Sequence, residues 1–144
     1  MTTPRIHLDL IGLVVADMGK ALAFYRRLGL DLPESADAEP HVELTLPGGL
    51  RLAFDTVDTV RSIDPRWSPA VGGPAMALAF HCGTAADVDA VYTELTGAGH
   101  RSHRQPWDAF WGQRYAQILD PDGNSVDLFA PLADTRQNAG TGEH

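Results

Sequence analysis

The stretch WGQRYAQILDPDGNSVDLF, residues 111–129, decides the fold. Two of its segments, 114–119 and 125–129, have the residue pattern of β-strands. Between them lies Asp-Pro-Asp-Gly-Asn, where Pro121 presets φ for a turn and Gly123 can adopt a positive φ without steric penalty. The sequence therefore predicts a β-hairpin here.

An aromatic cluster of Trp107, Phe110 and Trp111 comes just before the strands of this hairpin. Proline and glycine punctuate this segment, so we expect a surface loop rather than a strand. Large aromatic side chains in such a loop can contact a planar or cationic ligand. They can equally cover the end of a sheet or pack at a subunit interface, and the sequence leaves these alternatives open.

The first half of the chain predicts a strand, a helix and two short strands. Residues 6–16 are apolar on both faces from Leu10 onward, which is typical of a covered strand. Asp17 is placed to cap a helix over 18–28, in which apolar residues recur at helical spacing. Short strands follow at 41–46 and 50–55.

The second half repeats this order. Residues 75–82 predict a strand, 85–98 a helix and 100–104 a short strand, followed by the hairpin. Pro47–Phe54 corresponds to Pro121–Leu128, and Asp17 corresponds to Asp87. An internal repeat of about 70 residues indicates a duplicated unit of one strand, one helix and about three strands.

Composition indicates a single domain without a membrane segment. The 144 residues include 44% hydrophobic and 21% charged side chains, as in globular proteins. The net charge of −8 argues against nucleic acid as a partner and mildly favours cationic ligands. No apolar run is long enough to span a bilayer. The single cysteine, Cys82, suits the reducing cytoplasm, where we expect the protein to reside.

We expect one domain over 1–144, with two modules inside it. Module one covers about 6–55 and module two about 75–131. The intervening residues, about 56–74, have little periodicity and should form a linker or lid. The polar tail, 133–144, should be frayed.

Three segments resemble the vicinal oxygen chelate superfamily, which includes glyoxalase I, bleomycin-resistance proteins and extradiol dioxygenases. They are Gly12–Asp17, Ala23–Leu30 and Asp120–Asn124. The resemblance covers 6–131 and implies an α+β fold of two βαβββ modules, related by a pseudo-two-fold repeat, whose curved mixed sheets enclose a cleft. It also implies a homodimer. Residues 106–112 and the segment after them most resemble bleomycin-resistance proteins and uncharacterised glyoxalase-like proteins.

Metal-dependent members of this superfamily carry four ligands at equivalent places in the two modules. The matching positions here are Leu10, Ala53, Ala77 and Asp127. Three aliphatic side chains offer no lone pair, and one carboxylate does not hold a divalent ion. We therefore predict no metal and no other cofactor. A register shift of two residues, which would bring in His81 for Ala77, is the alternative.

The resemblance and the residues together predict a small-molecule binding protein that sequesters an aromatic or cationic natural product, as in antibiotic resistance. The candidate ligand-binding residues are Trp67, His81, Trp107, Phe110, Trp111, Arg114, Tyr115 and Asp127. The alternative is a glyoxalase-like lyase, isomerase or dioxygenase. Such an enzyme would be metal-dependent or would use His81 and Asp127 as acid and base.

Overall fold

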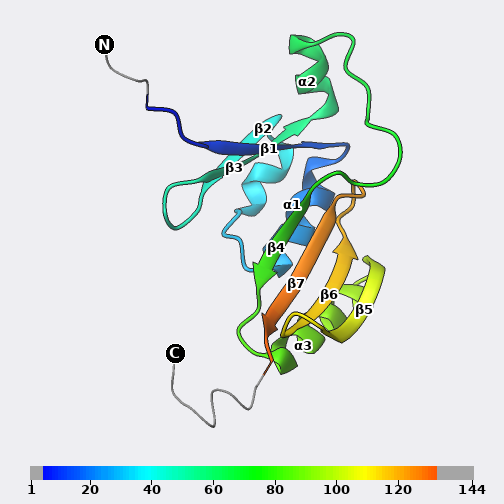
Figure 1. The fold of residues 1–144 in the computed structure, drawn as a ribbon. Coiled ribbons are helices and arrows are strands. Elements are labelled where there is room, and N and C mark those ends of the chain that lie inside the picture. The colour runs from blue at the N-terminus through cyan, green and yellow to red at the C-terminus, as the bar shows by residue number, and fades with distance from the viewer. Residues whose placement is uncertain (1–4, 133–144) are drawn as a thin grey trace. The chain divides into compact units, whose positions relative to one another are not determined.

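The computed structural model describes residues 5–132, and the chain divides into two compact units, Met1–Ala70 and Val71–His144. Each unit combines helices with one mixed β-sheet, which confirms the predicted α+β class (Figure 1). The predicted frayed tail lies outside the described residues. No helix within 5–132 has the length and apolar character needed to cross a membrane.

The first unit contains a three-stranded sheet in the order β1-β3-β2. Strand β1 runs parallel to β3, and β2 runs antiparallel to it. The elements in chain order are β1 (Leu10–Val15), α1 (Met18–Arg27), the 3₁₀ helix η1 (Glu34–Ala38), β2 (His41–Thr45), β3 (Arg51–Thr56) and α2 (Val57–Ile63).

Helix α1 forms the core of the first unit with β3. Asp17 caps it as predicted, because its carboxylate accepts a hydrogen bond of 3.0 Å from the Lys20 backbone N–H. The apolar side of α1 is fully buried, and the Tyr25 ring lies 5.4 Å from that of Phe54 on β3. Burial of such a side chain stabilises the fold by about 1.5–3 kcal/mol.

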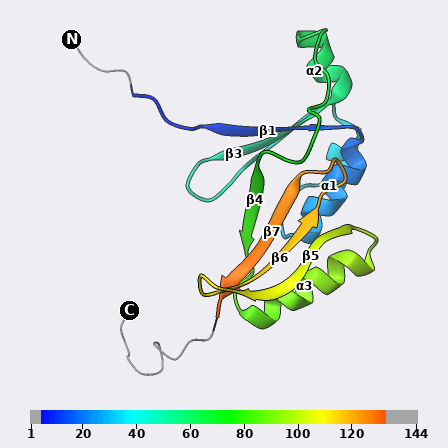
Figure 2. The same ribbon diagram turned by 45° about the vertical axis from the view of Figure 1, so that its right-hand side comes forward.

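The second unit contains a four-stranded sheet in the order β4-β7-β6-β5, with helix α3 along one face (Figures 1 and 2). Strand β4 is parallel to β7, and the other pairs are antiparallel. The elements are β4 (Ala77–His81), α3 (Ala85–Gly97), β5 (Arg101–Ala109), β6 (Gln113–Leu119) and β7 (Ser125–Pro131).

Helix α3 begins at Ala85, as the sequence predicted, but Asp87, which the repeat matched to Asp17, is not its N-cap. Thr84 is the N-cap, and its hydroxyl accepts a 3.2 Å hydrogen bond from the Asp87 backbone N–H. The Asp87 carboxylate accepts a 3.0 Å bond from the Thr84 N–H in return, which completes a capping box. Asp87 therefore supports the cap from the third helical position.

The predicted hairpin is confirmed, with its turn at Asp120–Asn124. The Asp120 N–H donates to the Asn124 carbonyl at 2.9 Å, and the Gly123 N–H donates to the Asp120 carbonyl at 2.9 Å. Gly123 has a φ of +86°, as the turn prediction required. The buried Asp120 carboxylate also accepts bonds from the backbone N–H groups of Asp122 and Asn124, at 2.9 and 2.8 Å.

The turn between β2 and β3 repeats this geometry. The Leu46 N–H donates to the Leu50 carbonyl at 2.8 Å, and the Gly49 N–H donates to the Leu46 carbonyl at 2.9 Å. The two turns therefore align residue for residue, which places Ala53 of β3 where β7 has Asp127. The structure thus supports the repeat inferred from the sequence.

The two units nevertheless differ in strand number. Two strands follow α1 within the described part of the first unit, whereas three follow α3. The predicted third strand is therefore wrong for the first unit. The 3₁₀ helix lies in the corresponding place, and its Asp37 carboxylate accepts a 2.5 Å hydrogen bond from Arg26 of α1. Pro33 immediately precedes this helix as its N-cap, and the proline ring fixes the φ of that residue.

Two local predictions also need correction. The expected structureless linker 56–74 begins with helix α2, whose N-cap is Thr56. Seven residues are too few to show a helical period. The expected loop before the hairpin is largely strand, because β5 continues to Ala109 and carries Trp107.

Replacement of Asp120 tests the turn that sets this hairpin. Asp120→Ala should lower the free energy of unfolding by about 1–3 kcal/mol, because the part-buried N–H groups of Asp122 and Asn124 lose their acceptor. Asp120→Asn keeps one carbonyl acceptor and should cost less. Urea denaturation of both variants measures the effect. Wild-type stability in Asp120→Ala would show that the side chain does not fix the turn.

Candidate functional site

The second sheet has one face toward α3 and one face away from it. Arg114 of β6 pairs with Asp89 of α3 at 2.9 Å, so its side of β6, with the fully buried Ala116 and Ile118, faces the helix. Successive strand residues point to opposite sides. We call the side away from α3 the aromatic face. Strand register places on it Ala77, Ala79, His81, Trp107, Tyr115, Gln117, Ser125, Asp127 and Phe129.

Several predicted aromatic residues do come together at this face. Trp107, Trp111 and Tyr115 contact one another edge to face, with ring centroids 5.3–6.2 Å apart. Such pairs contribute about 0.5–1.5 kcal/mol beyond their buried area. The Trp111 indole N–H donates to the Gln113 side chain at 2.8 Å, which holds its ring in place. Phe110, in the turn after β5, contacts Trp111 at 5.0 Å and is 96% exposed.

Asp127 and Tyr115 form the polar centre of the aromatic face. The Tyr115 hydroxyl donates to Asp127 Oδ2 at 2.6 Å. The other carboxylate oxygen accepts bonds from Gln117 at 3.3 Å and Ser125 at 3.2 Å. Burial and then the bond to Asp127 raise the pKa of Tyr115 to about 12, so the phenol keeps its proton near neutral pH.

His81 lies at the end of β4 on the same face and is exposed. Its Nδ1 accepts a 3.0 Å hydrogen bond from the Gly83 backbone N–H, and its ring lies 5.0 Å from that of Phe129. A nitrogen that accepts from a backbone N–H carries no proton in the neutral ring. The other nitrogen, Nε2, therefore carries the proton, and His81 presents a donor rather than a base.

Two further predicted residues are Arg114, which lies on the other side of this sheet, and Trp67, which belongs to the other unit. Arg114 lies on the helix side, where its guanidinium pairs with Asp89 and with Asp108, each at 2.9 Å. Those hydrogen bonds also raise the pKa of Arg114. Trp67 belongs to the first unit, where the Arg61 guanidinium lies 5.7 Å from its ring. Arg114, predicted as a ligand-binding residue, therefore does not share a face with Tyr115 and Asp127.

Sequence reasoning missed Arg104. On β5, Arg104 lies opposite Gln117 and Trp107 lies opposite Tyr115, so three residues of β5 match two of β6. This bulge brings both side chains to the aromatic face, although an odd spacing normally separates them. The Arg104 Cζ lies 3.6 Å from the centroid of the Trp107 ring. Pro106 was the available signal, because proline in a strand marks an edge or a bulge.

The corresponding face of the first sheet is charged, and it too was missed. His41 Nδ1 lies 2.5 Å from Asp55, and its Nε2 lies 2.8 Å from Glu43. Arg51 donates to Glu43 at 2.6 Å and to Asp9 at 2.5 Å. The bonds to Asp55 and Glu43 raise the pKa of His41. The period-two spacing of 41 with 43, and of 51 with 55, was the readable signal.

The metal-ligand positions that the resemblance implied can be checked within each unit. Leu10 and Ala77 each begin the first strand of a unit, and Ala53 and Asp127 occupy equivalent places after the turn glycine. Aliphatic side chains cannot coordinate, and both Asp127 oxygens already accept hydrogen bonds. Within residues 5–132, no group of three or more His, Cys, Asp or Glu side chains is arranged for a metal. The residues present do not fit the metal that this superfamily uses.

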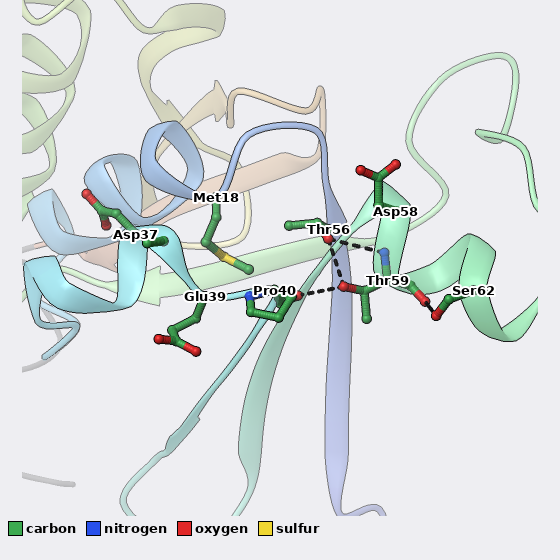
Figure 3. A pocket seen from close by; sticks show the side chains of 9 residues that line it. Met18, Asp37, Glu39, Pro40, Thr56, Asp58, Thr59 and Ser62 are labelled. Atoms are coloured by element: carbon green, nitrogen blue, oxygen red, sulfur yellow. Dashed lines mark hydrogen bonds between the residues drawn. The ribbon is translucent and has the colours of Figure 1, made fainter.

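The first unit has an open pocket of about 480 Å³, and none of the predicted site residues lines it (Figure 3). Its hydroxyl groups bond to their own surroundings: Thr59 donates to the Pro40 carbonyl at 3.1 Å, and Ser62 donates to the Thr59 carbonyl at 2.6 Å. The lining residues are Met18, Asp37, Ala38, Glu39, Pro40, Thr56, Asp58, Thr59 and Ser62. The hydroxyl groups of the pocket are thus committed to local structure.

Two units of strand, helix and antiparallel hairpin, with equivalent turns, define a duplicated α+β fold. The chain belongs to the Glyoxalase/Bleomycin resistance protein/Dioxygenase superfamily, whose family model matches residues 7–128. No curated protein sequence matches it significantly.

Solved structures show the same fold. A family enzyme from Burkholderia phytofirmans has a TM-score of 0.74 and 20% identity, over 88% of this chain and 100% of that one. A glyoxalase/bleomycin resistance protein/dioxygenase from Nocardioides has a TM-score of 0.69 and 22% identity, over 99% and 91%. A glyoxalase-related enzyme from Fulvimarina pelagi has a TM-score of 0.71 and 20% identity, over 86% and 87%.

The His41 cluster predicts a pH-dependent stability. In the folded protein the pKa of His41 is raised above its usual 6.5. The stabilisation that protonated His41 provides is therefore fully present below pH 6.5 and is lost as the pH rises through the folded-state pKa. The free energy of unfolding should therefore fall above pH 6.5, and His41→Gln should remove that part of the fall. Urea titrations across pH 5.5–9 measure it. His103→Gln, on β5, is the matched control, and an equal change in both variants would contradict the assignment.

Proposed function

We propose that this protein binds a small planar aromatic compound at the aromatic face of the second unit and sequesters it without chemical change. The carrying observation is the set of contacting rings of Trp107, Trp111 and Tyr115, next to the almost fully exposed Phe110. Large aromatic side chains that stay exposed together commonly mark an interaction site. Ordered rings also bind at little cost in conformational entropy.

The polar groups of this face suit orientation of a ligand more than catalysis. His81 offers Nε2–H as a donor, and the Tyr115 hydroxyl is committed to Asp127. Asp127 accepts three side-chain hydrogen bonds, which leaves little capacity to take a proton from a substrate. These contacts argue against His81 and Asp127 as the acid and base of a glyoxalase-like enzyme.

The donor set also argues for a metal-free function. Leu10, Ala53 and Ala77 stand where the superfamily places ligands, and none of them can coordinate. Sequestration needs only shape and stacking, so it is compatible with these residues. The homodimer, the cytoplasmic location and a role in antibiotic resistance remain predictions from the sequence resemblance.

Stacking at this face can be tested by titration of the full chain with planar aromatic compounds, including intercalating drugs. We expect saturable binding by calorimetry, with the compound recovered unchanged. Trp111→Ala should weaken binding about 2- to 10-fold, because it removes an aromatic contact.

Tyr92→Phe is the matched control, because it alters an aromatic side chain of the same unit on α3, at the opposite face of the sheet, and it should bind as the wild type does. Conversion of the compound to a product, or equal binding by Trp111→Ala and the wild type, would argue against sequestration at this face.

A further inference from the structure

Arg104 lies on the aromatic face and stacks on a ring of the cluster. Its Cζ lies 3.6 Å from the Trp107 centroid, close to van der Waals contact, so the guanidinium covers the indole ring. Within residues 5–132, no carboxylate pairs with this guanidinium, whereas Arg26, Arg51 and Arg114 are each held by acidic side chains. Its N–H donors are therefore positioned and still available.

The neighbouring carboxylate does not compete for Arg104. Asp127 lies on β7, separated from β5 by β6, and its oxygens accept hydrogen bonds from Tyr115, Gln117 and Ser125. Gln117, opposite Arg104 in the register, donates its amide to Asp127 and thus stands between the two charges. In the part of the chain that the structure describes, this face thus holds one satisfied carboxylate, Asp127, and two arginines without a carboxylate partner: Arg104 beside the rings, and Arg101 opposite Leu119.

A stacked guanidinium is well suited to anions. Its planar N–H fork matches a carboxylate or phosphate, and contact with the ring orients the fork before a ligand arrives. The same positive charge repels a cation that approaches Trp107. The cation–π surface of Trp107, which a cationic ligand would use, is already occupied by Arg104.

We propose that Arg104 selects the ligand by charge, so that this face takes planar aromatic compounds with an anionic group such as a carboxylate. This inference rests on the proposed function and narrows it. The aromatic part of the ligand rests on the ring cluster, and its anionic group pairs with the Arg104 guanidinium. Cationic aromatic compounds, which the sequence left as an option, are disfavoured.

Three naphthalene probes of the same size separate these possibilities: 2-naphthoate, 2-naphthylmethylammonium and the neutral 2-naphthalenemethanol. NMR titration of the full chain follows the indole N–H signals of Trp107 and Trp111. We expect 2-naphthoate to bind about 10-fold more tightly than the ammonium probe, as for a partly desolvated charge-assisted pair. Arg104→Gln should abolish that advantage and leave the affinity for the neutral probe unchanged.

Arg101→Gln is the matched control, because it removes the same charge from the same strand, six residues before Trp107 on β5. It should keep the preference for 2-naphthoate. Equal binding of both charged probes, or a preference that survives Arg104→Gln, would overturn the role of Arg104 while the proposed function stands. If none of the three probes shifts either indole signal, the proposed function fails, and this inference fails with it.

Discussion

The hydrogen bonds of the Asp120 turn hold β6 and β7 in one register, and the chemistry of the second unit depends on that register. Because strand side chains alternate, a slip of β6 by one residue against β7 would turn Tyr115 toward α3, away from Asp127, and would bring Arg114 and Ala116 to the aromatic face. The turn resists such a slip through two backbone bonds and the buried Asp120 carboxylate. A local constraint of five residues thus decides which side chains meet.

The two units show how one backbone pattern carries different surfaces. By turn and register, His41 corresponds to Tyr115, and Asp55 corresponds to Phe129. The first sheet therefore has an ion-paired face where the second has an aromatic one. The charged side chains on the first sheet pair with one another. They therefore rigidify the sheet and leave few groups free to bind a ligand. The corresponding face of the second unit instead carries exposed aromatic rings and the Arg104 guanidinium, and it is therefore the better candidate for a binding site.

Much of the fold could be predicted from the sequence, because its signals were local. Pro121 and Gly123 predicted the hairpin, and Asp17 predicted the start of α1; the structure confirms both. Pro106 was a weaker signal for the bulge in β5, since only the hydrogen bonds to β6 define where the bulge lies. Without the bulge, Trp107 was expected in a loop and Arg104 was overlooked.

The site was harder to predict, because the sheet face on which a side chain lies depends on the register of strand pairing. Arg114 is a plausible ligand contact by residue type, but Asp89, 25 positions earlier, holds it on the helix side. His41 and Asp55 are 14 positions apart, and only the β2–β3 pairing brings them together. Composition and spacing identify candidate residues, whereas pairing between distant segments decides which of them share a face.

Net charge and local charge point in opposite directions in this protein. A total of −8 favours cations at long range, but charges beyond about 8–10 Å are largely screened at physiological salt. The Arg104 guanidinium is stacked directly on the Trp107 ring, and the Asp127 carboxylate already accepts hydrogen bonds from three side chains. A ligand that reaches the Trp107 ring therefore meets a positive charge in contact with that ring. Local geometry, rather than the overall acidic balance, sets the charge preference of this face.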